Sequence, residues 1–442
     1  MASAAPHRRT WPERVAIAAT ITAAVLCFLT AGGLAAAYMV VRNRDVVEIT
    51  NPATRRPEPL TTPVTTVGPV ATTATGDTAP PTQATAAPTT PPETFPPADP
   101  TAKNFLITGA DNGACVDPNS PYAPAFGDEE SGRVGERSDT IMVFRVDPAA
   151  KRMAVLSFPR DLYVTIADTG NRARINTAYR RDEPQRLIDT IYENFGVGID
   201  HFIQVDFCTF KTLVDAVGGI AVPFDYPARD RNTGLGVQAV GCVTLDGDHA
   251  LAYVRSRKYE YEDPPGSNNW RDDESADLGR ISRQQDFLRR TLSSLLAKGL
   301  LNPSVARGLI NSATGGNVVT DSELSPAKLL EFAGVLRDVE PGSILTYQIE
   351  AVDRMVSGAA VLEPRIEGDN MQAVLAMFRG ETSLAEAPEQ VFAPTTPPVS
   401  RTAVPGTRPA PETTVPPETA APTEAVPAEN VFGIVPPRGV EC

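Results

Sequence analysis

Apolar and polar positions divide the chain into segments of distinct character. An uninterrupted apolar run lies near the N-terminus, and polar stretches rich in proline occupy residues 42–100 and 383–442. Between them, over residues 101–382, short apolar runs alternate with longer runs that are apolar at every third or fourth position. The first pattern is typical of strands and the second of amphipathic helices. The sequence therefore predicts a folded part over residues 101–382, either one large domain or a core with a C-terminal lobe.

Four short apolar runs in this segment predict strands: NFLITG (104–109), TIMVFRV (140–146), MAVLSF (153–158) and HFIQVDF (201–207). The DPAAKR stretch between the second and third is typical of a hairpin turn. Periodic segments predict helices at 184–196, 209–219, 280–299 and 325–336, and the apolar MQAVLAMF stretch (371–378) closes the fold. Strands and helices that alternate in this way favour an α/β fold, a three-layer domain with a mixed central sheet and helices on both of its faces.

The apolar N-terminal run, residues 15–41, carries no charge and is long enough to cross a bilayer. Arg8, Arg9 and Arg14 precede it, so the positive-inside rule places residues 1–14 in the cytoplasm. A cleaved signal peptide is the alternative, but the run is too long for one and no small-residue cleavage site closes it. We therefore expect one transmembrane helix and a folded domain on the outer side of the cell membrane.

Composition excludes several other interpretations. The proline-rich stretches cannot bury enough apolar surface to fold, so we expect a disordered spacer at 42–100 and a disordered tail at 383–442. The chain has 54 acidic and 40 basic residues and a formal net charge of -14, which disfavours a nucleic-acid partner. Residues 1–14 are also too few to hold a DNA-binding domain.

Four cysteines follow the apolar run: Cys115, Cys208, Cys242 and Cys442. An even number in an oxidising compartment indicates disulfides, and three pairings are possible. None of the cysteines lies in a CxxC arrangement, which disfavours a zinc or thioredoxin-like site. Our working assignment is Cys208 with Cys242, and Cys115 with Cys442.

The stretch ALAYVRSR carries the first candidate chemistry. Its apolar residues lead into Arg255 and Arg257, which are two positions apart. If the backbone is extended there, both side chains point to the same face. Two guanidinium groups aimed at one target are suited to an anion, and their bidentate geometry favours phosphate.

Similar arginine and carboxylate motifs occur at the ends of other predicted elements. They are Asp111 after FLITGA, Arg137 and Asp139 in GERSDT, Arg160 in SFPRDLYV, and Asp277, Arg280 and Gln284 in DLGRISRQQ. Arginines that converge at strand ends can hold a diphosphate, and carboxylates among them can bind Mg²⁺. Such a set suits phosphoryl transfer, in which a remaining aspartate accepts the proton of an attacking hydroxyl.

Each motif also has a simpler interpretation. An arginine beside a carboxylate is most often a local ion pair that contributes about 0–1 kcal/mol at a surface. The loop tryptophan Trp270 is either part of a lid or an exposed aromatic, and His201 and His249 are structural or exposed. The sequence contains no HExxH, GxSxG or P-loop motif. Because several arginine motifs recur at element ends, we favour a functional site.

Taken in order, these motifs resemble the LytR–CpsA–Psr family of bacterial cell-envelope proteins. The resemblance covers residues 103–300 and extends more loosely to about 380, and actinobacterial members look most similar. It implies an enzyme that transfers a polyprenyl-pyrophosphate-linked glycan to a peptidoglycan hydroxyl, with Mg²⁺ assisting and the lipid in an apolar pocket between sheet and helices. The partners it implies are the lipid-linked glycan, peptidoglycan and the membrane.

The resemblance also implies roles for individual residues. Asp111 and Asp139 match the metal-binding or base aspartates. The pyrophosphate clamp is matched by Arg137, Arg160, Arg255 and Arg257. Asp277, Arg280 and Gln284 match the helix start that shapes the substrate site. His249 departs from the usual acidic residue or glutamine, and the insert at 258–276 leaves the contacts with the acceptor open.

Two rival functions use the same residues. A non-catalytic envelope protein would bind lipid-linked precursors or wall polymer without turnover. A polyprenyl-pyrophosphate pyrophosphatase would release phosphate without an acceptor. The sequence does not identify the glycan, since any lipid-linked polymer presents the same diphosphate.

Overall fold

The computed structural model describes residues 45–54, 94–110, 115, 117, 119–123, 138, 140–181, 183–298, 318–392, 432–436, 440 and 442. Within them, seven strands form the central sheet in the order β1-β14-β7-β2-β3-β4-β15. Their bounds are β1 (Asp45–Val47), β14 (Val318–Asp321), β7 (His201–Asp206), β2 (Lys103–Ala110), β3 (Thr140–Asp147), β4 (Arg152–Ser157) and β15 (Leu345–Gln348). The sheet is mixed: β2 runs parallel to β7, whereas β3 runs antiparallel to β2 and β4.

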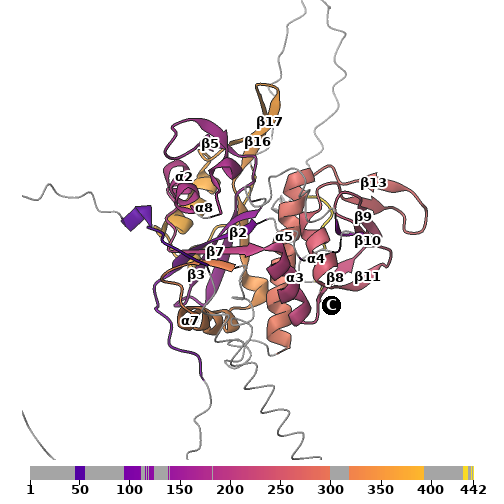
Figure 1. Cartoon of the computed structure of the whole chain (residues 1–442), viewed down its shortest axis with the longest axis horizontal. Helices are drawn as coiled ribbons and strands as arrows, with labels where there is room; N and C mark the ends of the chain where they lie inside the picture. The colour runs from indigo at the N-terminus through magenta and orange to yellow at the C-terminus, as the bar shows by residue number, and fades with distance from the viewer. Residues whose placement is uncertain are drawn as a thin grey trace, which may run out of the picture.

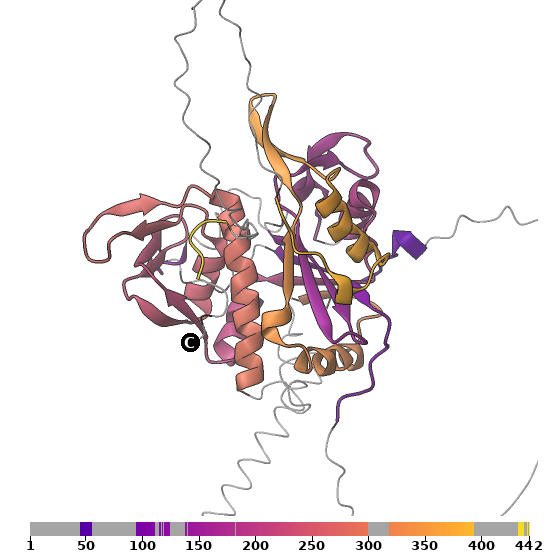
Figure 2. The same cartoon turned by 180° about the vertical axis from the view of Figure 1, so that it is seen from behind.

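Helices cover both faces of this sheet (Figures 1 and 2). α2 (Gln185–Phe195) and α8 (Asp369–Arg379) pack on the face that includes Leu106 and Val143. α5 (Ala276–Ala297) and α7 (Pro326–Arg337) pack on the opposite face, which includes Phe105 and Met142. Neighbouring residues in a strand point to opposite faces, so the continuous apolar runs of β2 and β3 fill both layers. The predicted α/β architecture is confirmed.

A second lobe packs on the outer side of α5. It contains α3 (Phe207–Ala216), α4 (Gly247–Arg255) and the antiparallel pair β8 (Ile220–Phe224) and β11 (Gly241–Leu245). It also contains a four-stranded sheet: β10 (Leu235–Val237), β9 (Ala228–Asp230), β12 (Glu260–Glu262) and β13 (Trp270–Asp272). Two hairpins complete the described strands: β5 (Tyr163–Thr165) with β6 (Arg172–Arg174), and β16 (Ala351–Val356) with β17 (Ala359–Pro364).

Local capping explains several helix boundaries. Asp206 ends β7 and accepts a hydrogen bond from the Thr209 amide, so α3 begins directly after the strand. Ser325 Oγ accepts from the Lys328 amide at the start of α7, and Pro326 occupies the first turn. Gly196 ends α2 in the left-handed conformation, with a φ of 71°.

Several predicted boundaries are corrected. β1 and the short helix η1 (Pro52–Thr54) lie in the predicted spacer, yet β1 pairs with β14 at the edge of the sheet. In the predicted tail, η6 (Leu384–Glu386) packs on the core through the fully buried Leu384, and residues 432–436 contact α5. Backbone pairing and single apolar side chains hold these segments on the domain. The average amino-acid composition of a proline-rich stretch does not predict such local contacts.

The insert at 258–276 is also structured. It forms the β12–β13 hairpin, and Trp270 lies in β13 instead of an exposed loop. The guanidinium carbon of Arg229 lies 4.0 Å from the centroid of the Trp270 ring. The short helices η4 (Ile175–Ala178) and η5 (Pro341–Ser343) connect other elements of the described chain.

The cysteines form two disulfides, Cys115–Cys208 and Cys242–Cys442. This confirms structural disulfides but corrects both assigned pairs. β2 and β7 are parallel neighbours, so the segment after β2 and the start of α3 leave the same edge, which brings Cys115 to Cys208. The assigned pairs, one within the domain and one that ties the tail down, do not take this strand order into account.

No helix among the described residues is long and apolar enough to cross a membrane. The predicted anchor, residues 15–41, lies outside the described part of the chain.

Candidate active site

Four strand ends meet at one edge of the central sheet. β2 and β7 end side by side, with Ala110 opposite Asp206. β3 begins at the same edge, where Thr140 lies opposite Gly109, and β4, antiparallel to β3, ends there. The chain therefore leaves β2, β4 and β7, and enters β3, at one edge of the sheet.

Three predicted site residues belong to those segments but lie outside the described residues: Asp111, Arg137 and Asp139. Their chain neighbours are placed. Ala110, which precedes Asp111, and Thr140, which follows Asp139, both lie at the shared edge.

Arg255 lies at this edge through a contact with α3. Its guanidinium carbon is 4.2 Å from the centroid of the Phe207 ring, and Phe207 is the first residue after β7. The predicted extended backbone is wrong, because Arg255 is the last residue of α4. Asp246 caps that helix by accepting from the His249 amide, a local signal that outweighs the short apolar run.

The turn between Arg255 and Arg257 is fixed by a buried carboxylate. Asp230 Oδ2 accepts hydrogen bonds from Ser256 Oγ at 2.6 Å, from the Arg257 amide at 3.0 Å and from the Lys258 amide at 2.9 Å. Asp230 is fully buried in β9. Charge-assisted bonds of this kind are stronger than neutral ones, so the backbone that carries both arginines is held firmly.

Gln284 joins α5 to the same edge. Its Nε2 donates to Thr140 Oγ1 at 3.2 Å and to the Val254 carbonyl at 3.0 Å. The next residue, Gln285, donates to Ser157 Oγ at 3.0 Å, at the end of β4. The first half of α5 is therefore bonded to the start of β3, the end of β4 and the end of α4.

Arg280 and Asp277 form an ion pair, with 3.1 Å between Nη2 and Oδ1. α5 begins at Ala276, about one turn earlier than the predicted start at residue 280. Asp277 therefore lies in the first turn of the helix instead of before it. The Arg280 side chain is only 2% exposed, so this pair contributes to the packing of the helix start.

Arg160 follows β4 and is partly buried. Its Nε lies 3.4 Å from Asp161 Oδ2, and the other oxygen of Asp161 lies 3.2 Å from Arg174 Nε. The structure thus places Arg160 at the strand-end edge and adds Arg174, in β6, as a second partner of the same carboxylate.

Arg283 is a residue that sequence reasoning missed. Its side chain is fully buried, with Nη1 donating to Asp273 Oδ2 at 2.8 Å and Nη2 donating to the Ser256 carbonyl at 2.9 Å. Burial acts to raise the pKa of Asp273, but hydrogen bonds from Ser275 and Arg283 outweigh it and lower the pKa. An arginine four residues before the buried Phe287, on an apolar helix stripe, is the signal that could have revealed it.

The described residues contain no group of three or more His, Cys, Asp or Glu side chains that could hold a metal ion. Asp230 and Asp277 are already bonded within the protein, so they do not fit a Mg²⁺ site. His201 is buried, with its Nδ1 3.3 Å from Asp321 Oδ1. The Nδ1 of His249 lies 3.0 Å from Asp246 Oδ1. Both histidines have local structural contacts.

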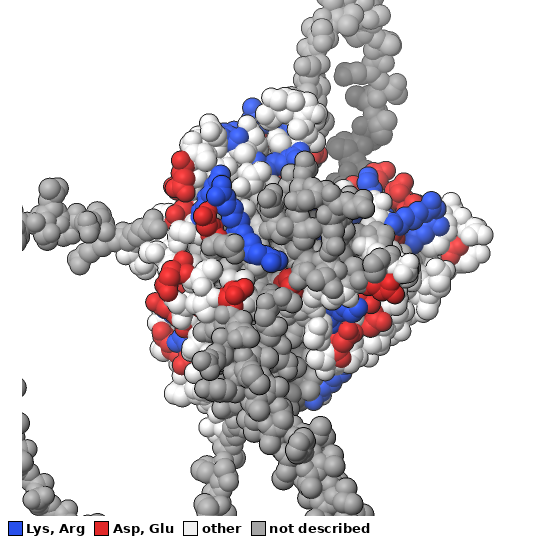
Figure 3. Space-filling model, in the orientation of Figure 1, with Lys and Arg blue, Asp and Glu red and all other residues white. Residues whose placement is uncertain are grey.

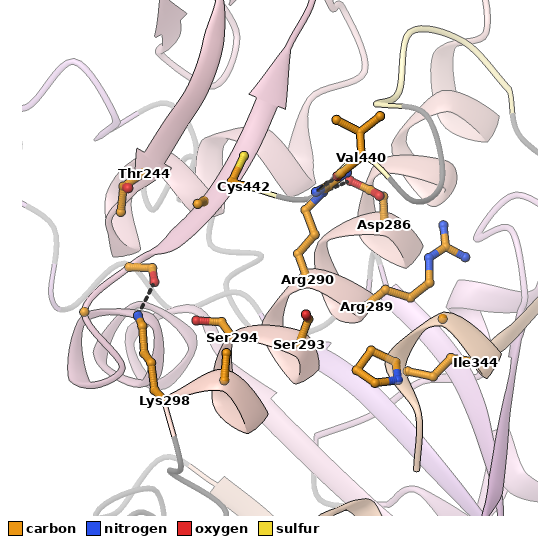
Figure 4. A pocket seen from close by; sticks show the side chains of 16 residues that line it. Thr244, Asp286, Arg289, Arg290, Ser293, Ser294, Lys298, Ile344, Val440 and Cys442 are labelled. Atoms are coloured by element: carbon orange, nitrogen blue, oxygen red, sulfur yellow. Dashed lines mark hydrogen bonds and ion pairs between the residues drawn. The ribbon is translucent and has the colours of Figure 1, made fainter.

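A cavity of about 700 Å³ lies along the second half of α5 (Figure 4). Arg289, Arg290 and Lys298 line it together with the end of the chain, Val440 and Cys442. Figure 3 shows basic and acidic side chains interspersed over the described surface of one face of the molecule.

The observations above define an α/β protein in which Arg160 follows β4 and Arg255 contacts Phe207, next to strands that end at one edge of a mixed sheet. The chain belongs to the LytR_cpsA_psr family, whose model matches residues 71–376.

Two curated relatives illustrate the similarity. The chain is 31% identical over 234 residues to the probable cell wall biosynthesis protein LcpB of Corynebacterium glutamicum, which takes in 51% of this chain and 50% of LcpB. It is 32% identical over 199 residues to the polyisoprenyl-teichoic acid–peptidoglycan teichoic acid transferase TagU of Bacillus licheniformis, with 45% of this chain and 58% of TagU covered. The chain thus spans about half the length of these relatives.

A solved LytR-Csp2A-Psr enzyme from Actinomyces oris is 23% identical, with 62% of this chain and 89% of that chain covered and a TM-score of 0.48.

Proposed function

We propose that this protein transfers a polyprenyl-pyrophosphate-linked glycan to a hydroxyl group of peptidoglycan. The observation that carries the proposal is the placement of Arg255 beside Phe207, at the edge where β2, β3, β4 and β7 meet. Asp230 fixes the turn that leads to Arg257. Two similar proteins, the probable cell wall biosynthesis protein LcpB and the teichoic acid transferase TagU, support the same class of reaction.

In the proposed reaction, the acceptor hydroxyl oxygen attacks the phosphorus that carries the glycan. The bond from this phosphorus to the bridging oxygen of the pyrophosphate breaks, and polyprenyl phosphate leaves with that oxygen. The product is a phosphodiester between glycan and peptidoglycan, and the hydroxyl proton passes to a carboxylate. The protein's main contribution is to position the groups and neutralise their charge.

We assign the charge neutralisation to Arg160, Arg255 and Arg257, with Arg137 as a fourth member of the clamp. We propose that Asp111 and Asp139 bind Mg²⁺ and that one of the two accepts the proton. When bound, Mg²⁺ would neutralise phosphate oxygens. Asp277, Arg280 and Gln284 shape the site from the start of α5, and the bonds of Gln284 to Thr140 and Val254 support this role.

The polyprenyl chain needs an apolar surface near the diphosphate. Apolar side chains of the sheet pack against α5 and α7, and several at the margin of this layer are only partly buried, among them Phe144, Ile203, Leu288 and Leu329. We propose that the lipid enters this layer. Residues 15–41 would anchor the protein so that the site faces the outer leaflet, where lipid-linked glycan and peptidoglycan are both within reach.

A transfer assay tests the proposal. The full chain in detergent is mixed with Mg²⁺, a labelled polyprenyl-pyrophosphate-linked glycan and a peptidoglycan acceptor. We expect labelled glycan on the acceptor and released polyprenyl phosphate, both lost in the Arg255→Ala/Arg257→Ala variant. Arg354→Ala is the matched control, because Arg354 pairs with Glu363 in a surface hairpin.

The same assay separates the rival functions. Lipid-linked glycan that binds without any product would indicate a non-catalytic envelope protein. Phosphate release that does not depend on the acceptor would indicate a pyrophosphatase. Full transfer in the double arginine variant would contradict the clamp.

A further inference from the structure

The end of the chain returns to the folded domain. We call the described residues 432–436, Val440 and Cys442 the C-terminal strap. The rings of Phe392 and Phe432 lie 4.9 Å apart in an edge-to-face contact. The strap then runs along α5, where Figure 2 shows it in yellow. It lies beyond residue 376, where the family match ends.

Several bonds hold the strap in place. The Phe432 amide donates to Ser282 Oγ at 2.9 Å, and the Ile434 amide donates to Asp273 Oδ2 at 3.2 Å. Arg290 donates to the Val440 carbonyl at 2.8 Å, a contact drawn in Figure 4. The disulfide between Cys442 and Cys242 attaches the last residue of the strap to β11.

The strap fits closely against the start of α5. Gly433 has a φ of 72°, and a Cβ placed on it would lie 2.6 Å from Asp273 Oδ1 and closer still to Ser275 Oγ. No larger residue fits there without a shift of Asp273 or Ser275. The position of the strap is therefore coupled to the Asp273 carboxylate.

Asp273 connects the strap to the arginine site. One carboxylate oxygen, Oδ2, accepts from both the Ile434 amide and Arg283 Nη1. Arg283 in turn donates to the carbonyl of Ser256, the residue between Arg255 and Arg257. A buried arginine with a fixed partner on one side holds the group on its other side in one position.

We propose that the C-terminal strap is a positioning element of the arginine site. It holds Asp273 and Arg283 in register, and through the Ser256 carbonyl it orients the backbone that carries Arg255 and Arg257. This inference rests on the proposed function for the role of those two arginines, and it assigns to the end of the chain a part in diphosphate binding.

Two variants of the full chain in detergent release the strap in different ways. Gly433→Ala displaces it from Asp273 while the disulfide stays, and Cys242→Ser/Cys442→Ser removes the disulfide while Gly433 stays. The matched control is Gly358→Ala, since Gly358 has a φ of 81° with no atom near its missing Cβ. Geranylgeranyl diphosphate is the binding probe, and amide hydrogen exchange at Arg257 and Lys258 reports the order of the turn bonded to Asp230.

We expect both strap variants to weaken probe binding about tenfold, roughly the effect of one charge-assisted hydrogen bond. The amides of Arg257 and Lys258 should exchange faster in both, and Gly358→Ala should match the unaltered chain in both readouts. Ser282→Ala, which removes one strap bond without steric conflict, should have a smaller effect in the same direction and guards against a folding defect.

Unchanged affinity and unchanged exchange in both strap variants would overturn the inference, and so would tighter binding, which would make the strap a cover over the site. If the unaltered chain fails to bind the probe but the variants still show faster exchange, the clamp function fails while the positioning contact stands.

Discussion

The guanidinium group of Arg255 lies over the ring of Phe207, with 4.2 Å from its central carbon to the ring centroid. Arg255 ends α4 and Phe207 begins α3, so the contact joins the ends of two helices at the sheet edge. A planar cation stacked on an aromatic ring keeps a defined orientation.

Replacing Arg255 with lysine should reduce kcat/KM for transfer about tenfold or more, because lysine keeps the charge but loses the bidentate geometry and the stacking. Phe207→Leu should reduce it about fivefold, in line with a cation–π contribution of about 1 kcal/mol. A double-mutant cycle checks the contact: in the Arg255→Ala background, Phe207→Leu should have little further effect. Additive losses would show that the two residues act separately.

Removing the Asp230 carboxylate should lower the free energy of unfolding more than removing any one of the donors that bond to it. Asp230→Ala leaves Ser256 Oγ and two amides without their acceptor, so the free energy of unfolding should fall by about 3 kcal/mol or more. Ser256→Ala removes one of these bonds, and the expected loss is about 1–2 kcal/mol. Chemical denaturation measures both. Equal losses in the two variants would contradict the central role of the carboxylate.

Arg160 and Arg174 provide a matched comparison because both pair with Asp161. Only Arg160 follows β4 at the strand-end edge, so Arg160→Ala should abolish most transfer activity, whereas Arg174→Ala should retain it. Each variant should lose no more than about 1 kcal/mol of stability, as expected of partly exposed ion pairs. The transfer assay decides: equal activity in the two variants would mean that Arg160 serves only to hold Asp161.

Sequence patterns predicted the elements whose signals are local. The apolar runs of β2, β3, β4 and β7 are long enough to be read alone, and α7 carries its own cap in Ser325 and Pro326. α4 was misread because its apolar run is short, and the capping role of Asp246 was overlooked. The motifs at the sheet edge were found for the same reason, since each lies next to a strong strand or helix signal.

The remaining features depend on contacts between distant parts of the chain. β1 has only three residues and exists through its pairing with β14. Asp230 and Arg283 meet the candidate arginines only after the second lobe has packed on α5. The strap depends on a disulfide and on backbone amides, and neither leaves a periodic pattern in the sequence.

Asp273 makes a final prediction about pH. Its pKa is lowered in the folded protein, so its contribution to stability is present above its unfolded pKa of about 4 and is lost as the pH falls through the lower folded value. Asp273→Asn should therefore destabilise the protein at pH 7, and the difference from the unaltered chain should shrink in acid below about pH 4. Denaturation at several pH values measures this difference. Ser282→Ala, which removes a neighbouring strap bond but no titrating group, should show a difference that does not change with pH. A pH-independent effect of Asp273→Asn would mean that the Asp273 side chain stabilises the protein by its packing and not by its charge. The charge-assisted bond from Arg283 to Asp273 would then contribute little to the position of Ser256.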